Sequence, residues 1–248
     1  MDLLQNFNPW LSRLLESLFP RICVLCQADS LTGIDLCRGC QEELPWIDHC
    51  CAICSIPLPL QHTVCGQCLQ SSPAYQASCI AFQYRYPVAQ LNLQFKHQQQ
   101  LMYGQVLSQL LSQFIDCRIQ DSKKPDVLIP VPLHSRRQRQ RGFNQAHEIA
   151  LVLSRNLGLP LMGRAVVRNR HTASQKSLGS QDRAKNLKGC FSLAGSVAGM
   201  SVAIVDDVMT TGATVQELAS LLRSAGTREV QIWALARTPI QPTHHALL

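Results

Sequence analysis

The sequence places two adjacent carboxylates shortly before a loop that is rich in hydroxyl groups. Apolar residues 202–205 precede Asp206 and Asp207, and a Thr/Gly stretch follows at 210–214. In open α/β sheets, ligands bind where parallel strands end, and the first N–H groups of the next helix bind phosphate. Two adjacent acids are costly to hold together unless they bind vicinal hydroxyl groups or a metal. The pattern predicts an acidic site beside a phosphate-binding loop formed by Thr210, Thr211, Gly212, Ala213 and Thr214.

A strand–turn–helix whose threonines only cap the helix is the alternative for this stretch. It explains the threonines and Gly212, but it does not explain the two acids beside them. The stretch contains neither the GK[ST] of a Walker loop nor the GxGxxG of a dinucleotide-binding turn. A phosphate site of another kind is therefore the better interpretation.

Nine of the 12 cysteines lie between residues 23 and 68, and their spacing occurs twice. Each copy has two CxxC pairs separated by ten residues. Four thiolates at this spacing suit tetrahedral zinc, and a closed set without an open position favours a structural role. Disulfides would need an oxidising compartment, and a redox CxxC would sit in a βαβ unit that this segment lacks. The predicted ligands of two structural zinc ions are Cys23, Cys26, Cys37 and Cys40, then Cys51, Cys54, Cys65 and Cys68.

Cys50 interrupts the second copy of this repeat. It could replace Cys51 as a ligand, but the spacing to Cys54 would then become CxxxC. His49 and His62 lie nearby, outside the register of the repeat. We therefore expect Cys51 to be the ligand.

Positive charge is concentrated in the middle of the chain. The net charge is +7, whereas residues 123–188 alone hold 14 basic and 3 acidic residues, a net +11. Such a segment suits either an anionic partner or a solvated basic face. In an extended segment, the alternating arginines, Arg137, Arg139 and Arg141, would share one face, opposite Gln138 and Gln140. The candidate contacts to phosphate or nucleic acid are Arg136, Arg137, Arg139, Arg141, Arg168, Arg170, Arg183, Lys185 and Lys188.

The elements that must position these residues alternate between strand and helix. Apolar runs and 3.6-residue periodicity predict strands at 80–86, 126–131, 165–168, 201–205 and 229–236, and helices at 88–118, 144–157 and 213–225. This order predicts an α/β fold with a parallel sheet. We expect three parts: an N-terminal amphipathic helix at 1–20, a zinc module at 21–72 and the α/β domain at 73–248.

Length and composition fit a globular protein of one or two domains. The chain has 248 residues, of which 46% are hydrophobic. No apolar run reaches the roughly 18 residues needed to cross a bilayer, and the N-terminus lacks the pattern of a secretory signal. We expect a cytoplasmic protein without stable membrane insertion.

Residues 202–214 resemble the signature of type I phosphoribosyltransferases. Residues 129–145, 168–175 and 183–191, together with a preceding double zinc ribbon, resemble the ComF/GntX competence family over nearly the whole chain. The resemblance implies a parallel sheet flanked by helices that binds 5-phosphoribosyl-1-pyrophosphate (PRPP) with Mg²⁺. Asp206 and Asp207 would bind the ribose hydroxyls, residues 210–214 the 5′-phosphate, and residues 168–189 would form a mobile loop. The implied pyrophosphate loop is Val131, Pro132, Leu133 and His134.

Two classes of function remain open. One is a phosphoribosyltransferase-like enzyme, with an unidentified acceptor, that acts in uptake or processing of transforming DNA. The other is a non-catalytic protein with a vestigial PRPP pocket, which binds single-stranded DNA or acts as a zinc-dependent adaptor for the competence machinery. Steep salt dependence would indicate contacts to a nucleic-acid backbone. The zinc module carries more acids than bases, which favours scaffolding or protein contact there over DNA binding.

Overall fold

The computed structural model describes residues 21–60, 62–97, 100–119, 124–169 and 187–239. The expected helix at 1–20 lies outside the described residues. The chain forms two compact units, of which the first ends at Leu44 and the second begins at Pro45. This division falls between the two cysteine groups, so the second group belongs to the unit that holds the main sheet. The domain boundaries expected from the sequence stay predictions.

The first unit is small and holds the first cysteine group. Its described part contains the antiparallel strands β1 (Arg21–Ile22) and β2 (Asp29–Ser30), followed by helix α2 (Arg38–Glu42). Few apolar side chains of residues 21–44 are buried, among them Ile34 and Leu36. Where the apolar core is small, a bound metal can supply much of the folding free energy.

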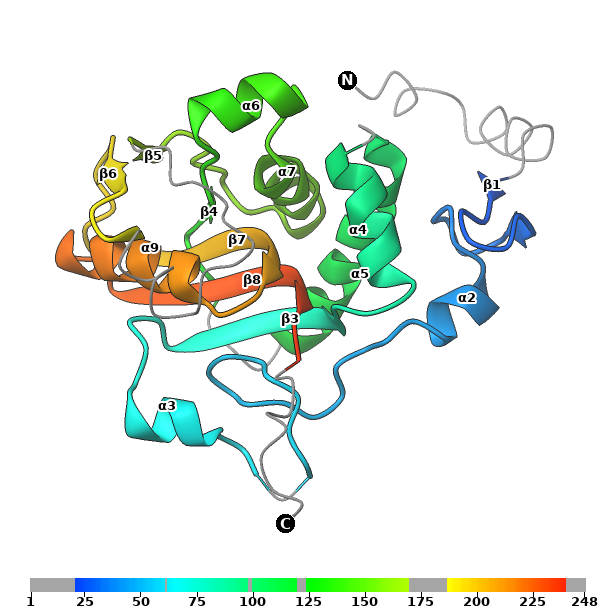
Figure 1. Ribbon diagram of the computed structural model, residues 1–248, viewed down its shortest axis with the longest axis horizontal. Helices are drawn as coiled ribbons and strands as arrows, with labels where there is room; N and C mark the ends of the chain where they lie inside the picture. The colour runs from blue at the N-terminus through cyan, green and yellow to red at the C-terminus, as the bar shows by residue number, and fades with distance from the viewer. Residues whose placement is uncertain (1–20, 61, 98–99, 120–123, 170–186, 240–248) are drawn as a thin grey trace, which may run out of the picture. The chain divides into compact units, whose positions relative to one another are not determined.

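The second unit is built on a four-stranded parallel sheet, as the sequence predicts (Figure 1). The strand order is β3-β8-β7-β4, with bounds β3 (Ala77–Gln83), β8 (Glu229–Arg237), β7 (Ser201–Met209) and β4 (Val127–Pro130). All four residues of β4 and the first five of β7 are buried. Continuous apolar runs of this kind are typical of parallel strands that are covered on both faces.

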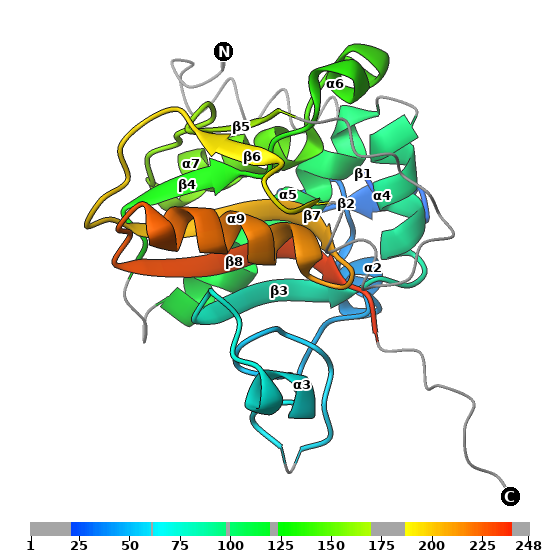
Figure 2. The same ribbon diagram turned by 60° about the vertical axis from the view of Figure 1, so that its left-hand side comes forward.

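Helices cover both faces of this sheet (Figure 2). Helices α5 (Leu101–Ile119) and α7 (Gln145–Leu157) contact each other on one face, and α4 (Val88–His97) packs on α5. Helix α9 (Ala213–Ser224) contacts β7 and β8 on the opposite face. The helices predicted at 88–118 and 213–225 are thus confirmed, and the first of them is divided at the glutamine run into α4 and α5.

Helix α7 shows how local sequence sets the ends of an element. Asn144 is its N-cap, and the Asn144 side chain accepts a hydrogen bond of 3.1 Å from the Ala146 N–H. Gly158 ends the helix with φ of 67°, a left-handed conformation that costs glycine little. The helix predicted at 144–157 is therefore confirmed to within one residue.

Three details differ from the sequence-based expectations. Residues 135–141 form a helix, α6 (Ser135–Arg141), so the one-face arrangement that an extended segment would give their arginines does not apply. Arginine and glutamine are good helix formers, which favours this outcome. Strand β7 runs on to Met209 because it pairs with β8 along this whole length, so both acids lie within the strand. Strand β3 begins and ends three residues earlier than expected.

A second, two-stranded sheet lies beside the main one. The predicted short strand β5 (Val166–Arg168) pairs antiparallel with β6 (Phe191–Leu193), which the sequence analysis did not predict. These strands flank residues 170–186, which lie outside the described residues. Among the described residues, no helix is both long enough and apolar enough to span a membrane.

Candidate functional site

The acid pair lies near the carboxyl end of β7, where it contacts helix α4. The Asp207 carboxylate forms an ion pair with Lys96, and its Oδ2 accepts a hydrogen bond of 3.4 Å from Asn92 Nδ2. Asp206 Oδ1 accepts a hydrogen bond of 2.9 Å from the Asp207 N–H. The side chains of Lys96 and Asp207 are only 19% and 14% exposed. Both acids are thus fixed in place, one by a cation and the other by the backbone.

The two carboxyl groups differ in their protonation. Burial, together with the neighbouring Asp207 carboxylate, raises the pKa of Asp206 to about 8. Burial would also raise the pKa of Asp207, but Lys96 and Asn92 outweigh it and hold that pKa below its usual range. Near neutral pH, Asp207 is therefore ionised while Asp206 mostly retains its proton. One acid can accept hydrogen bonds from ligand hydroxyls, and the other can donate one.

The predicted phosphate loop, residues 210–214, leads directly into α9. Thr210 and Thr211 are exposed, and the α9 N-cap is Gly212, with φ of 80°. A Cβ at Gly212 would lie 2.9 Å from the terminal methyl of Met209, which can move, so it is the left-handed backbone that disfavours a larger residue here. Gly212 gives the helix no side-chain cap. The Ala213 N–H instead donates a 3.4 Å hydrogen bond to Thr211 Oγ1. The N–H groups of a helix's first turn suit an anion, and here they follow the hydroxyls of the loop directly.

The expected pyrophosphate loop, residues 131–134, follows β4, which neighbours β7. The Val131 N–H donates a hydrogen bond of 2.9 Å to the Val205 carbonyl, directly before the acid pair. Val131 is buried, whereas Pro132, Leu133 and His134 are partly exposed. Asn144 Nδ2 donates a 3.0 Å hydrogen bond to the Val131 carbonyl and so ties this loop to α7. The two loops thus leave neighbouring strands at the same edge of the sheet.

Arginines from two other elements act electrostatically on the acids. Burial lowers the pKa of Arg141, and its two charged neighbours oppose each other, since Asp207 raises this pKa and Arg137 lowers it. The pKa of Arg168 is likewise lowered, first by burial and then by Arg137, while Asp206 raises it. Helix α6 and strand β5 therefore bring positive charge to the acid pair. Partly buried guanidinium groups suit the oxygens of a phosphate or pyrophosphate.

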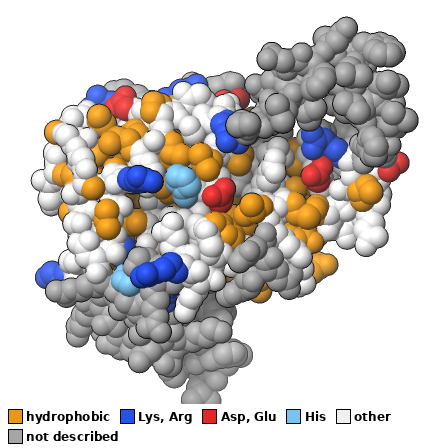
Figure 3. All heavy atoms as spheres, turned by 90° about the horizontal axis from the view of Figure 1, so that it is seen from above, with side chains coloured by type: hydrophobic (Ala, Val, Ile, Leu, Met, Phe, Trp, Pro, Cys, Tyr) orange, Lys and Arg blue, Asp and Glu red, His pale blue; other side chains and the backbone are white. Residues whose placement is uncertain are grey.

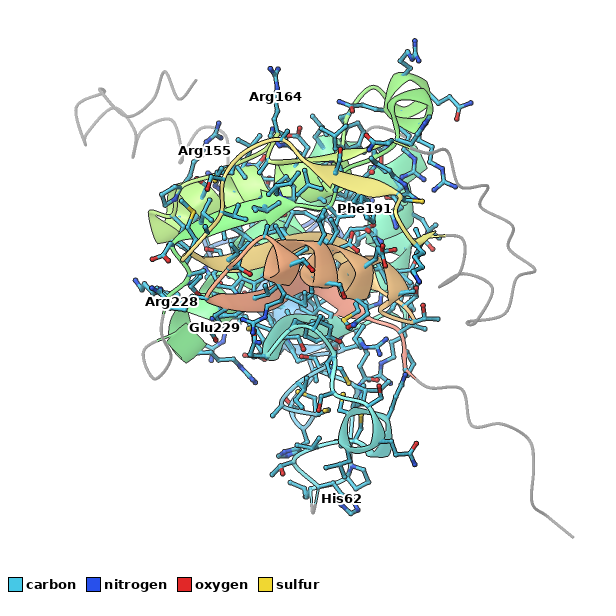
Figure 4. All side chains as sticks on the ribbon, turned by 90° about the vertical axis from the view of Figure 1, so that its left-hand side faces the viewer. His62, Arg155, Arg164, Phe191, Arg228 and Glu229 are labelled. Carbon is cyan, nitrogen blue, oxygen red and sulfur yellow. The ribbon has the colours of Figure 1, made fainter. Side chains whose placement is uncertain are left out.

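Other predicted basic contacts lie elsewhere. Arg139 and Lys188 are exposed, and the N–H of Gly189, which follows Lys188, donates a 2.8 Å hydrogen bond to Glu217 of α9. The Arg136 side chain, Arg170, Arg183 and Lys185 lie outside the description of the structure. Figure 4 shows Arg155 and Arg164 projecting outward, apart from Phe191. Only part of the basic segment therefore gathers at the acids.

Sequence reasoning missed three residues of this site. Asn92 and Lys96 stand one helical turn apart on α4, and their contact with Asp207 has no local signal because more than 100 residues intervene. The only local indication of a polar contact is that Asn92 and Lys96 lie at i and i+4, on one side of a helix that is predicted to pack on the core. Asn144 lies within residues 129–145, which carry the family resemblance, but the resemblance assigned it no role.

Each cysteine group fits a zinc ion. In each, all four sulfur atoms lie within 4.8 Å of one another, and Cys26–Cys37 and Cys54–Cys65 are both 3.6 Å apart. A tetrahedral site with Zn–S bonds of about 2.3 Å requires sulfur separations of roughly 3.8 Å. The Cys65 N–H donates a 3.3 Å hydrogen bond to Cys51 Sγ, which stabilises the thiolate form that binds metal. Cys51, rather than Cys50, therefore belongs to the second group.

Comparisons with known proteins agree with these two kinds of site. Residues 14–69 match a double zinc ribbon domain, and residues 102–246 match a phosphoribosyl transferase domain. Competence protein F of Haemophilus influenzae is 38% identical over 87% of this chain and 96% of its own length. The chain belongs to the competence protein F family.

Two other relatives of this chain are named a DNA utilization protein and a competence protein. The DNA utilization protein YhgH of Escherichia coli K12 is 36% identical over 88% of this chain and 98% of that protein. Competence protein ComFC of Bacillus subtilis is 26% identical over 83% and 90%. Among solved structures, a purine phosphoribosyltransferase from Pyrococcus horikoshii is 18% identical, with a TM-score of 0.34 over 57% of this chain and 92% of its own. The glutamine PRPP amidotransferase of B. subtilis is 22% identical, with a TM-score of 0.36 over 53% and 25%.

Proposed function

We propose that this protein binds PRPP with Mg²⁺ at the carboxyl ends of β4 and β7, and that it acts in the cytoplasm in uptake or processing of transforming DNA. The observation that carries the proposal is the acid pair, in which Asp207 is ion-paired with Lys96 and Asp206 accepts a backbone hydrogen bond, shortly before the loop that leads into α9. The names of the relatives, competence protein and DNA utilization protein, support the biological role.

The site provides a complement to each part of a phosphoribosyl ligand. Asp207 accepts hydrogen bonds from one ribose hydroxyl and Asp206 donates to or accepts from the other. The N–H groups and hydroxyls of residues 210–214 bind the 5′-phosphate, and residues 131–134 approach the pyrophosphate with positive charge from Arg141 and Arg168. Magnesium prefers hard oxygen ligands, which the carboxylates and the ligand supply, and it would add positive charge at the leaving group.

Transfer to an acceptor forms part of this proposal. When pyrophosphate leaves, the sugar carbon becomes cation-like, and the protein acts mainly by positioning the ligand and neutralising the leaving group. Arg141 and Arg168 suit that second task because a guanidinium binds two phosphate oxygens at once. The fixed geometry of the acids holds the sugar ring while the bond breaks.

Calorimetric titration with PRPP and Mg²⁺ tests the proposal. We expect the wild-type protein to bind, and the double variant Asp206→Asn/Asp207→Asn to bind at least 100-fold more weakly. Asp116→Asn is the matched control because Asp116 is exposed near the C-terminal end of α5. This variant should bind PRPP as the wild type does. Absence of binding at millimolar PRPP, or equal binding by the double variant, would refute the site.

Binding of single-stranded DNA is the second candidate function. The net +11 charge of residues 123–188 and the exposed Arg139 favour it. On the face in Figure 3, however, the Lys and Arg side chains of the described residues lie apart among apolar and neutral side chains, without forming a continuous stripe. Replacement of the four arginines between residues 136 and 141 by Glu should weaken DNA binding most, and that binding should fall steeply with salt. A zinc-dependent protein adaptor would instead form a metal-dependent complex without either ligand.

A further inference from the structure

One buried side chain connects the second cysteine group to the phosphate loop. Arg237, the last residue of β8, is only 5% exposed. Its Nε donates a hydrogen bond of 3.1 Å to the Cys54 carbonyl. Its Nη1 donates to the Met209 carbonyl at 2.9 Å and to the Thr210 carbonyl. One guanidinium thus binds the backbone of a zinc ligand and the backbone at the start of the phosphate loop.

The environment of Arg237 gives it a positioning role. A buried cation is costly unless it is fully hydrogen-bonded. Its hydrogen-bond partners among the described residues are main-chain carbonyls, and no carboxylate there lies within ion-pair distance. Because the guanidinium is planar and rigid, moving the carbonyls on one side displaces the group from those on the other. The arrangement of the Cys54 backbone therefore affects that of the loop.

A second connection runs parallel to the first. Gln216 of α9 accepts a 3.0 Å hydrogen bond from the Ala74 N–H, shortly after the last zinc ligand. Buried Tyr75 follows, and its hydroxyl would lie 3.9 Å from a Cβ at Gly212. Tyr75 and Met209 share one hydrophobic cluster with all four cysteines of the second group. The metal site thus packs against the segments that shape the phosphate loop.

We propose that zinc at the second cysteine group and the phosphosugar at residues 210–214 bind cooperatively, and that Arg237 is the positioning residue that couples them. The inference rests on the proposed function only in its choice of ligand. With zinc bound, the Cys54 carbonyl is fixed, and Arg237 holds the Met209 and Thr210 carbonyls in the geometry that presents the loop N–H groups. Without zinc, the loop samples more conformations, and ligand binding must order it. Cysteines 23, 26, 37 and 40 lie in the other unit, so zinc there is not coupled.

Cooperativity of this kind is reciprocal. If zinc strengthens PRPP binding by some factor, PRPP must strengthen zinc binding at that site by the same factor, with typical couplings of about 5- to 150-fold. If PRPP leaves the association rate of zinc unchanged, the rate of zinc release to a chromogenic chelator falls by the same factor as the dissociation constant and so reports on the coupling. In the full-length wild-type protein, we expect PRPP with Mg²⁺ to slow release of one zinc about tenfold or more and to leave the other unchanged. Cys26→Ser/Cys37→Ser should retain only the slowed phase.

Arg237→Lys is the decisive variant because it keeps the charge but cannot bind both backbones at once. We expect it to retain two zinc ions, to bind PRPP about tenfold more weakly, and to lose the effect of PRPP on zinc release. Arg228→Lys is the matched control, since Arg228 lies just before the other end of β8 in a half-exposed ion pair with Asp126. If Arg237→Lys fails to fold, Gln216→Leu removes the second connection and should reduce the coupling.

Hydrogen exchange gives a readout without PRPP. Loss of the second zinc, or Arg237→Lys, should increase amide exchange in residues 210–214 at least tenfold, whereas loss of the first zinc should not. If the wild type binds PRPP but both zinc ions respond equally or neither responds, and exchange in the loop does not change, the coupling is refuted and the proposed function stands. If exchange responds to the second zinc but the wild type does not bind PRPP, the proposed ligand is wrong while the connection between metal and loop holds.

Discussion

Two neighbouring substitutions of the same chemistry should change stability in opposite directions. Asp206→Asn and Asp207→Asn each replace a carboxylate by an amide of nearly the same shape. Asp207 is paired with Lys96, whereas Asp206 is held mostly protonated by burial and by its neighbour. We expect Asp206→Asn to stabilise the unliganded protein at pH 8 and Asp207→Asn to destabilise it.

The pKa of Asp206 sets the magnitude of the first effect. That pKa is about 8 in the folded protein, against about 3.9 in an unfolded chain. Between these values the folded state binds more protons than the unfolded state, so the free energy of unfolding falls as pH rises, by up to about 1.4 kcal/mol per pH unit. Asn does not titrate, so the variant lacks this slope. Between pH 5 and pH 7, the free energy of unfolding of Asp206→Asn should therefore rise by about 1–3 kcal/mol relative to that of the wild type.

The ion pair sets the magnitude of the second effect. The pKa of Asp207 is lowered, so its stabilising contribution is present above about pH 4 and is lost only as pH falls through the still lower folded value. Breaking a buried pair by removing one partner typically costs about 3–5 kcal/mol. Asp206 can ionise in response and partly neutralise Lys96, so we expect a loss of about 2–3 kcal/mol at pH 7.

Urea denaturation from pH 5 to pH 8 in excess zinc measures both effects. Trp233 in β8 is 1% exposed and provides a fluorescence signal from the centre of the sheet. Comparing each variant with the wild type at the same pH cancels the pH dependence of zinc binding. The assignment of the proton to Asp206 is refuted if both variants are less stable than the wild type. It is also refuted if the free energy of unfolding of Asp206→Asn falls with pH as that of the wild type does.

Three further predictions address packing, capping and metal content. Gly104→Ala should lower stability in urea by about 1–3 kcal/mol, because its Cβ would lie 2.5 Å from the Phe95 ring; Gly66→Ala, with nothing within 4 Å, should not. Asn144→Ala should lower the free energy of unfolding by about 1–2 kcal/mol and weaken PRPP binding, because the side chain caps α7 and holds the loop after β4. Asn156 is exposed, so the control Asn156→Ala should leave PRPP binding unchanged. Elemental analysis should find two zinc ions per chain, and a strong chelator should reduce the far-UV circular dichroism; a single zinc ion would contradict the second group.

Local patterns predicted the elements and the metal ligands well. The cysteine spacing identified both groups because the ligands of each come from one short segment. The parallel sheet followed from apolar runs separated by helical periodicity, and the same periodicity gave the bounds of α7 to within one residue. These signals lie within a few residues of what they determine, so no tertiary information was needed.

The details that sequence reasoning missed depend on distant contacts. Lys96 meets Asp207 only because α4 packs beside the sheet, and nothing near Lys96 in the sequence indicates an acid. The acids were expected after β7, but pairing with β8 extends the strand past them. Arg137, Arg139 and Arg141 of α6 alternate with glutamines, which is a period typical of a strand, but arginine and glutamine have high helix propensity and a helix forms.

The pairing of β3 with β8 fixes when the sheet can form during synthesis. The hydrogen bond from the Val230 N–H to the Gln76 side chain joins residues 154 positions apart. At about 5–20 residues per second, the ribosome needs roughly 8–30 seconds to make that interval. The second cysteine group needs only its own short segment, so it can take up zinc while β3 still waits with an unpaired edge. A chain that stops before residue 229 would carry a formed metal site beside a strand without its partner, and such exposed edges promote aggregation.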